Sequence, residues 1–107
     1  MLEKVPELPE LICRLEECDA VLFDGTFWDD DELIRVQGRG RTARQMGHVP
    51  VGGAGGSLEM LSSLRGPRKI FIHINNTNPI LDRCSSEFRR VADAGWEVAE
   101  DGWEIRL

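Results

Sequence analysis

The chain has 107 residues and a formal net charge of −6, with 41% hydrophobic and 30% charged side chains, a profile typical of one small globular domain. No apolar run approaches the roughly 20 residues that cross a bilayer. The N-terminus also lacks the basic start and apolar core of a signal peptide, so we expect a cytoplasmic protein without membrane contact. The excess of acidic over basic residues argues against general binding to nucleic acid.

Several elements are predicted in the first third of the chain. Leu11, Ile12 and Leu15 are spaced for one helical face, which predicts a helix from Pro9 to about residue 17. The apolar run over residues 20–25 reads as a strand buried on both faces, as in a parallel or mixed sheet covered by helices. A helix toward Val36 follows, with Asp29 or Asp30 as its N-terminal cap.

The middle of the chain is rich in arginine and then in glycine. Residues 37–46 are predicted to form a loop or a frayed helix, because glycines interrupt the arginines. Residues 52–56 contain four glycines, and Ser57 is expected to cap a short helix with Leu58, Leu61 and Leu64 on one side. Gly66 and the proline after it end that helix.

The last third of the chain begins with a second apolar strand, over residues 68–74. The asparagines and the proline of residues 75–79 predict a turn. A helix carrying Phe88 and Val91 comes next and ends at Gly95. Residues 96–107 are predicted to form a hairpin, in which Trp96 and Trp103 pack against that helix. The succession of helices and strands predicts an α/β fold with crossover helices.

Two predicted strands end in a potential metal ligand, Asp24 in one case and His73 in the other. Ligands bind at the carboxyl ends of strands in α/β sheets, so these two side chains are candidates for one site. A carboxylate and an imidazole suit zinc, iron or manganese, but at least three protein ligands are needed. The alternative is that Asp24 caps a turn and that His73 is a hydrogen-bonded core residue.

Two further features have a functional and a structural interpretation. His48 lies in a predicted loop, where an imidazole either transfers protons or is simply solvated. The glycine run before Ser57 either holds an anion on backbone amides or reverses the chain tightly, and we favour the reversal because the run lacks the lysine of a nucleotide-binding loop.

Cysteines and arginines complete the set of candidate residues. The odd number and the spacing of Cys13, Cys18 and Cys84 argue against a disulfide framework and a zinc ribbon. We therefore expect free thiols that behave as small hydrophobic side chains. Four arginines between residues 35 and 44 form either a solvated surface or a site for a substrate carboxylate; they are Arg35, Arg39, Arg41 and Arg44.

Two long motifs show that these candidates belong together. They are Asp24-Gly25-Thr26-Phe27-Trp28 and His73-Ile74-Asn75-Asn76-Thr77-Asn78-Pro79. With the segments around them, from about Pro6 to the end of the chain, they resemble the C-terminal part of the pyrroloquinoline quinone (PQQ) biosynthesis protein B family.

The resemblance implies a fold and a set of site residues. The fold is the C-terminal half of a metallo-β-lactamase-like αββα sandwich, with a mixed sheet, covering helices and a C-terminal hairpin, so residues 1–107 are expected to form a single partial domain. Asp24 and His73 fall where this fold places metal ligands. His48 matches a Gly-His element used near the reaction centre by another branch of the fold and is the candidate catalytic residue. Asn75, Asn76 and Thr77 are the candidate substrate-binding residues.

The resemblance also implies an activity for the parent protein. It is an iron-dependent hydroxylation of the tyrosine ring in a small crosslinked Glu-Tyr precursor of PQQ. Zinc-dependent hydrolysis on the same fold, or non-catalytic carriage of PQQ or its precursor, are the alternatives. Because the other ligands of the fold's metal motif lie in an N-terminal half, the 107 residues alone are expected to be inactive and to hold Fe²⁺ or Zn²⁺ weakly. An exposed apolar sheet face would favour self-association.

Overall fold

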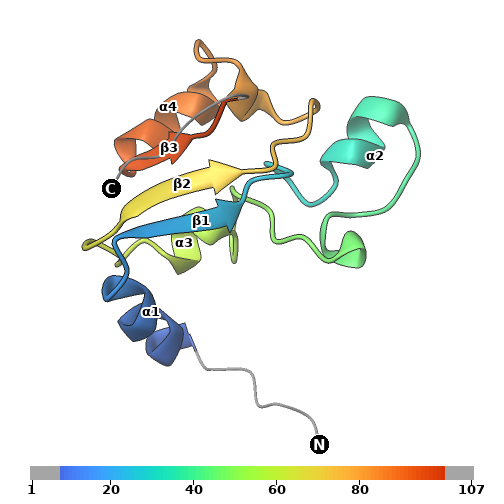
Figure 1. The fold of residues 1–107 in the computed structure, drawn as a ribbon. Helices are drawn as coiled ribbons and strands as arrows, with labels where there is room; N and C mark the ends of the chain where they lie inside the picture. The colour runs from blue at the N-terminus through green and yellow to red at the C-terminus, as the bar shows by residue number, and fades with distance from the viewer. Residues whose placement is uncertain (1–7, 101–107) are drawn as a thin grey trace, which may run out of the picture.

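A computed structural model describes residues 8–100 of the chain. The α-helices and strands follow one another in the predicted order, with two 3₁₀ helices added (Figure 1). The elements are α1 (Leu8–Glu16), β1 (Ala20–Asp24), α2 (Glu32–Gln37), the 3₁₀ helix η1 (Arg44–Met46), α3 (Ser57–Met60), β2 (Arg68–Ile72), the 3₁₀ helix η2 (Pro79–Leu81), α4 (Ser86–Asp93) and β3 (Trp96–Val98).

The three strands form one sheet in the order β1-β2-β3, and both pairings are parallel. Ala20 is opposite Arg68, and Lys69 is opposite Trp96. Parallel neighbours need a crossover, which α3 supplies before β2 and α4 before β3. The second strand of the expected hairpin, with Trp103, lies outside the described residues, so the mixed sheet that the hairpin would create stays a prediction.

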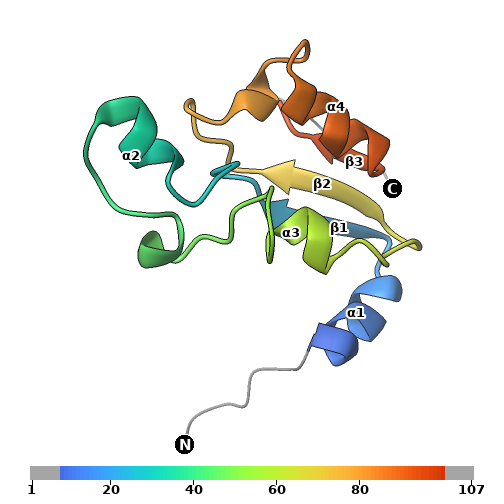
Figure 2. The ribbon, with the colours of Figure 1, turned by 180° about the vertical axis from the view of Figure 1, so that it is seen from behind.

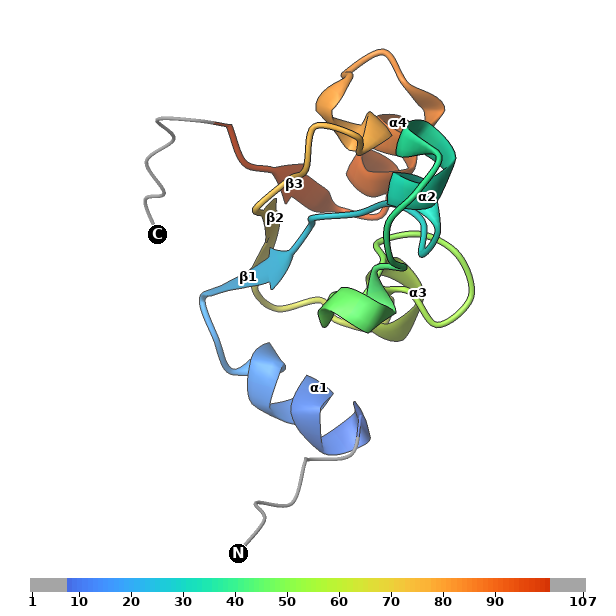
Figure 3. The same cartoon turned by 90° about the vertical axis from the view of Figure 1, so that its right-hand side faces the viewer.

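Helices α3 and α4 lie on the same side of the sheet (Figures 2 and 3). The core on this side contains Phe71 of β2, whose ring stacks on Trp96 with centroids 4.1 Å apart. Leu61 and Val91 are almost fully buried in the same cluster. Side chains alternate along a strand, so Leu22 of β1 faces the opposite side, where it is 51% exposed. Self-association through that side remains a prediction.

Lys69 is a buried cation on the helix-covered side of the sheet. Its Nζ donates to the carbonyl of Leu64 at 3.0 Å and to that of Ala94 at 3.4 Å. These carbonyls lie where α3 and α4 have ended, so the ammonium satisfies acceptors without a helical partner. Burial lowers the pKa of Lys69, and the nearby Arg65 lowers it further.

Two predicted helix caps are wrong. Ser57 is the first residue of α3 and Gly56 is the cap; the Oγ of Ser57 is buried and has no hydrogen-bond partner among the described residues. The N-cap of α2 is Asp31 rather than Asp29 or Asp30. The hydroxyl of Ser85, in contrast, accepts a hydrogen bond from the backbone N–H of Phe88 and caps α4.

The three cysteines are unpaired, and all are exposed rather than packed as small hydrophobic residues. Within residues 8–100, no helix is long and apolar enough to cross a membrane.

Candidate metal site at the strand ends

Asp24 and His73 lie at the same edge of the sheet. Asp24 is the last residue of β1 and pairs in register with Ile72, the last residue of β2. His73 therefore follows directly after the residue opposite Asp24. The sheet brings both predicted ligands to the carboxyl ends of adjacent strands, where α/β proteins bind their ligands.

The Asp24 carboxylate is held by two side chains. Its Oδ1 accepts a hydrogen bond of 2.6 Å from the hydroxyl of Thr26, and its Oδ2 lies 2.8 Å from Nδ1 of His48. A carboxylate only accepts, so Nδ1 donates this hydrogen bond, and in the neutral tautomer that has this donor the lone pair is on Nε2. The His48 ring also contacts the Phe27 ring edge to face, with centroids 5.8 Å apart. Asp24 and Phe27 thus hold the ring of this loop histidine, and Thr26 in turn holds Asp24.

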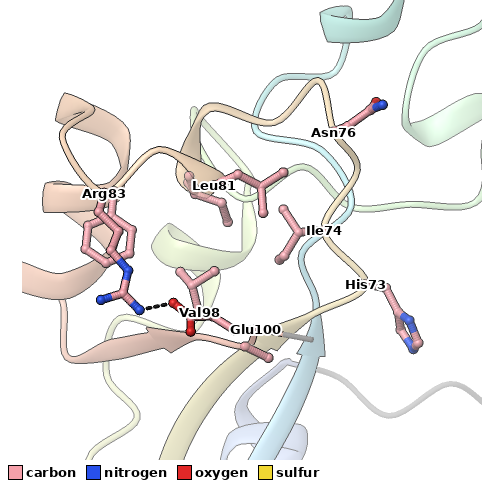
Figure 4. Close-up of a pocket in the computed structure, with 10 residues that line it drawn as sticks. His73, Ile74, Asn76, Leu81, Arg83, Val98 and Glu100 are labelled. Atoms are coloured by element: carbon pink, nitrogen blue, oxygen red, sulfur yellow. Dashed lines mark hydrogen bonds and ion pairs between the residues drawn. The ribbon is translucent and has the colours of Figure 1, made fainter. Parts of the chain in front are cut away.

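His73 is exposed, and its backbone φ is +56°, so the alternative of a buried core histidine is wrong. A positive φ is uncommon for a residue with a side chain and often marks a functional position. Its ring points away from the neighbouring cavity around Ile74 (Figure 4). The imidazole is therefore accessible at the end of β2.

Hydrogen bonds to backbone carbonyl groups hold the loops after β1 and β2 together, one donated by a backbone N–H and one by the side-chain amide of Asn78. The N–H of Gly25 donates to the carbonyl of Ile72 at 2.7 Å, and the buried amide of Asn78 donates to the carbonyl of Gly25 at 2.9 Å. A Cβ on Gly25 would lie 2.5 Å from Cδ1 of Ile74 and 2.8 Å from Cβ of Phe71. Only glycine lets the two loops approach this closely without rearrangement.

Glu32 is a residue of the site that sequence reasoning missed. It is 2% exposed, and its Oε1 accepts hydrogen bonds from the backbone N–H groups of Trp28 at 2.8 Å and Asp29 at 3.4 Å. Its Oε2 accepts a hydrogen bond of 2.6 Å from the hydroxyl of Thr77. A glutamate at the start of a helix, whose carboxylate accepts hydrogen bonds from the preceding backbone N–H groups, is a known capping pattern. The position of Glu32 at the start of a helix was therefore the signal in the sequence that could have identified it. No sequence pattern indicated the hydrogen bond between Glu32 and Thr77.

The three candidate substrate-binding residues differ in their surroundings. The side-chain amide of Asn75 donates to the hydroxyl of Thr77 at 2.7 Å, and that hydroxyl in turn donates to Glu32. Both residues therefore have partners inside the loop. Asn76 is exposed, and its side chain points outward (Figure 4). Within residues 8–100 the Asn76 side chain has no hydrogen-bond partner, so of the three it is the one whose amide is open to a substrate.

The glycine run reverses the chain. The backbone N–H groups of Gly56, Ser57 and Leu58 all donate to carbonyl groups of residues 50–53. Amides with internal partners cannot hold an anion, so the structure favours the reversal. Gly52 packs against the indole of Trp28, and a Cβ there would lie 2.6 Å from the ring.

The four arginines do not form one helical face, because α2 ends at Gln37. Arg35 pairs with Asp29 and Asp31, which raises the pKa of Arg35. Arg44 donates to the carbonyl of Gly55 at 3.1 Å. Arg39 and Arg41 are exposed.

The amino-acid sequence matches a known protein family. The sequence profile of the β-lactamase superfamily domain matches residues 2–74, which is more than half of the chain. The chain belongs to this family. The predicted metallo-β-lactamase-like fold is confirmed.

Individual proteins that are similar to this chain point to a more specific group within that superfamily. The coenzyme PQQ synthesis protein B of Methylococcus capsulatus is 50% identical over 99 residues, which are 92% of this chain and 33% of that protein. The protein of the same name from Rhizobium meliloti is 54% identical over 98 residues, with 91% and 32% covered. A crystal structure of Zn²⁺-bound PqqB from Methylobacterium extorquens superposes with a TM-score of 0.83 at 41% identity, covering 92% of this chain and 35% of that one. The resemblance to the protein B family is confirmed, and the chain spans about a third of the length of these relatives.

Proposed function

We propose that the protein acts in PQQ biosynthesis and that Asp24 and His73 are metal ligands in that role. The observation that carries the proposal is their position at the ends of two paired parallel strands, with the Asp24 carboxylate fixed by Thr26 and His48. The names of the relatives and the Zn²⁺-bound state of the M. extorquens protein support it.

The donor set fits a transition metal. One carboxylate and one imidazole suit Zn²⁺ or Fe²⁺, and each Asp24 oxygen keeps a lone pair beyond its present hydrogen bond. The described residues contain no group of three histidine, cysteine, aspartate or glutamate side chains that could hold a metal ion. Because at least three protein ligands are needed, we place the remaining ligands in another part of the protein. That residues 1–107 form a partial domain stays a prediction.

We infer an iron-dependent hydroxylation of the tyrosine ring in a crosslinked Glu-Tyr precursor. Fe²⁺ with open coordination positions would supply oxygen activation. Asp24 holds the His48 ring through Nδ1, so that Nε2 is oriented to take or return a proton. Asn76 is placed to orient the substrate, whereas Asn75 and Thr77 hold the loop that carries it.

Zinc-dependent hydrolysis is the second candidate, favoured by the Zn²⁺-bound relative. Oxygen consumption together with a hydroxylated product separates the first candidate from the second. A carrier that binds PQQ or its precursor without converting it would give neither hydroxylated nor hydrolysed product.

The test is PQQ production by a strain whose genomic copy of the gene carries Asp24→Asn or His73→Ala. We expect both changes to abolish production, and Asp93→Asn, an exposed carboxylate on α4, to leave it intact. Unchanged production in both site variants, with equal protein levels, would remove these residues from the metal site.

A further inference from the structure

A cavity of about 450 Å³ lies at the opposite edge of the sheet from Asp24 and His73. Its wall includes Lys69, the second residue of β2, and Trp96, the first residue of β3. These positions are at the amino ends of the strands, whereas the candidate metal ligands are at the carboxyl ends. The volume is within the usual range of sites for small molecules. The cavity is therefore separate from the candidate metal site.

Lys69 is a buried cation that has no counter-ion in the part of the chain that the structure describes. The residue is 8% exposed, and the partners of its Nζ among residues 8–100 are the carbonyl groups of Leu64 and Ala94. Buried charges in proteins are normally paired, because removing an unpaired ion from water is costly. An ammonium group has three N–H donors, so one donor of Lys69 is left for an anion.

Arg65 brings a second cation to the wall of this cavity. Its positive charge lowers the pKa of Lys69, after the larger effect of burial, so the two cations are close enough to repel each other. Nη1 of Arg65 donates to the carbonyl groups of Ser62 and Leu64, while Nε and Nη2 have no partner among the described residues. An anion that contacts both cations would replace this repulsion by two attractions.

Gly95 keeps one side of the Lys69 ammonium accessible. It follows α4, lines the cavity and has a φ of +84°, a conformation that favours glycine. A Cβ at this position would lie 3.4 Å from Nζ. A larger side chain would therefore fill the space beside the ammonium, and the glycine leaves that space to a ligand.

Two carboxylates lie near these cations. Glu16 raises the pKa of Lys69, but its oxygens already accept hydrogen bonds from the backbone N–H groups of Arg65 and Gly66. Asp93 lines the cavity and opposes an anion there, but it is exposed and water screens its charge. Two cations against one acid leave the wall with a net positive charge.

We propose that this cavity binds a small oxyanion, either free phosphate or the phosphate group of a monoester. The phosphate oxygens accept hydrogen bonds from Nζ of Lys69 and from the unpaired N–H groups of Arg65. Phosphate carries more charge at neutral pH than a carboxylate and has more acceptor oxygens, so one group can meet both cations. The proposal concerns binding only, and it holds whether or not the strand-end site performs the proposed chemistry.

The test is titration of the purified protein with inorganic phosphate at neutral pH, followed by the amide chemical shifts of Gly95 and Trp96. We expect saturable shifts with phosphate and none with sodium chloride at the same ionic strength. Acetate, with a single charge, should bind about ten-fold more weakly than phosphate. No saturable shift with phosphate, or equal affinity for acetate, would overturn the proposal.

Glycerol 3-phosphate distinguishes the two sources of the phosphate group. Tighter binding of this ester than of inorganic phosphate would assign the cavity to a monoester, because the volume beyond the phosphate group is then used. Weaker binding of the ester would assign the cavity to free phosphate.

Matched variants locate the site. Lys69→Met, which keeps a long side chain without the charge, and Arg65→Gln should each weaken phosphate binding about ten-fold or more. Arg89→Gln, an exposed arginine of α4 outside the cavity wall, should leave phosphate binding unchanged. Unaltered binding in both cavity variants would overturn the assignment. If Lys69→Met fails to fold by circular dichroism, Arg65→Gln decides, because Arg65 is exposed and Lys69 keeps its carbonyl partners in that variant.

Discussion

The carboxylate of Glu32 accepts a hydrogen bond of 2.6 Å from the hydroxyl of Thr77, although Glu32 belongs to the segment after β1 and Thr77 to the segment after β2. The bond joins the loop that begins at Asp24 to the loop that begins at His73. The relative position of the two candidate ligands thus depends in part on a buried carboxylate that forms no hydrogen bond with either of them in the described structure.

Glu32→Gln should destabilise the protein by about 1–3 kcal/mol, because an amide nitrogen replaces an oxygen that faces donors only. Urea unfolding at neutral pH measures the change. Glu59→Gln, an exposed position on α3, serves as the control. Equal urea midpoints for both variants would contradict the buried network.

Gly25→Ala should cost about 1–3 kcal/mol, because the new methyl group overlaps Ile74 and Phe71. The nearest atom is Cδ1 of Ile74, which Ile74→Val removes. We therefore expect the double variant Gly25→Ala, Ile74→Val to be less destabilised than the two separate effects predict. Strict additivity in thermal or urea unfolding would argue against this contact as the source of the cost.

His48→Gln should lower the affinity for Zn²⁺ about 10–100-fold with little change in folding, since residues that orient a metal ligand have effects of this size. The reason is that His48 holds Oδ2 of Asp24, the proposed ligand. Competition with a chromophoric chelator measures the affinity of the purified protein. Arg41→Gln, in the exposed loop after α2, is the control and should bind like the unaltered protein. An unaltered affinity in His48→Gln would separate His48 from the metal site.

The ion pair between Arg68 and Glu97 predicts a pH dependence of stability. Arg68 donates to both carboxylate oxygens of Glu97, at 3.0 and 2.8 Å, and these bonds lower the pKa of Glu97 below its ordinary value of 4.5. The stabilisation is complete above that ordinary value and is lost as the pH falls through the lowered pKa.

Glu97→Gln should therefore reduce the loss of stability on acidification, and Glu17→Gln, an exposed residue after α1, should not. Urea midpoints measured across the acidic range provide the comparison. Identical acid profiles for the unaltered protein and Glu97→Gln would show that this pair contributes nothing.

Much of the fold was predictable from local patterns. The apolar runs ending at Asp24 and near His73 predicted two strands, and the rule that ligands gather at the carboxyl ends of strands predicted that these residues share an edge. The proximity of His48 to Asp24 was implied by family resemblance alone, because it depends on the path of a loop 24 residues along the chain.

Other features were beyond sequence reasoning for physical reasons. The run Ile-Phe-Ile-His-Ile fits a buried strand throughout, but β2 ends at Ile72 and the chain turns at His73, whose φ is +56° and whose side chain is exposed. The hydrogen bond between Glu32 and Thr77 requires two loops to be folded before either side chain has its partner. Ser57 has the right chemistry for a cap, but the chain enters α3 through Gly56.

The all-parallel pairing of the described strands has a kinetic consequence. Ala20 meets Arg68, and Lys69 meets Trp96, so no strand can form its hydrogen bonds with a near neighbour in the chain. Contacts between distant residues slow folding, because a large loop must close before the contact is made. On the ribosome, β1 emerges long before its partner. The apolar residues of β1, including Leu22, are then exposed to solvent until β2 has been synthesised. Chaperones would have their greatest effect during this interval.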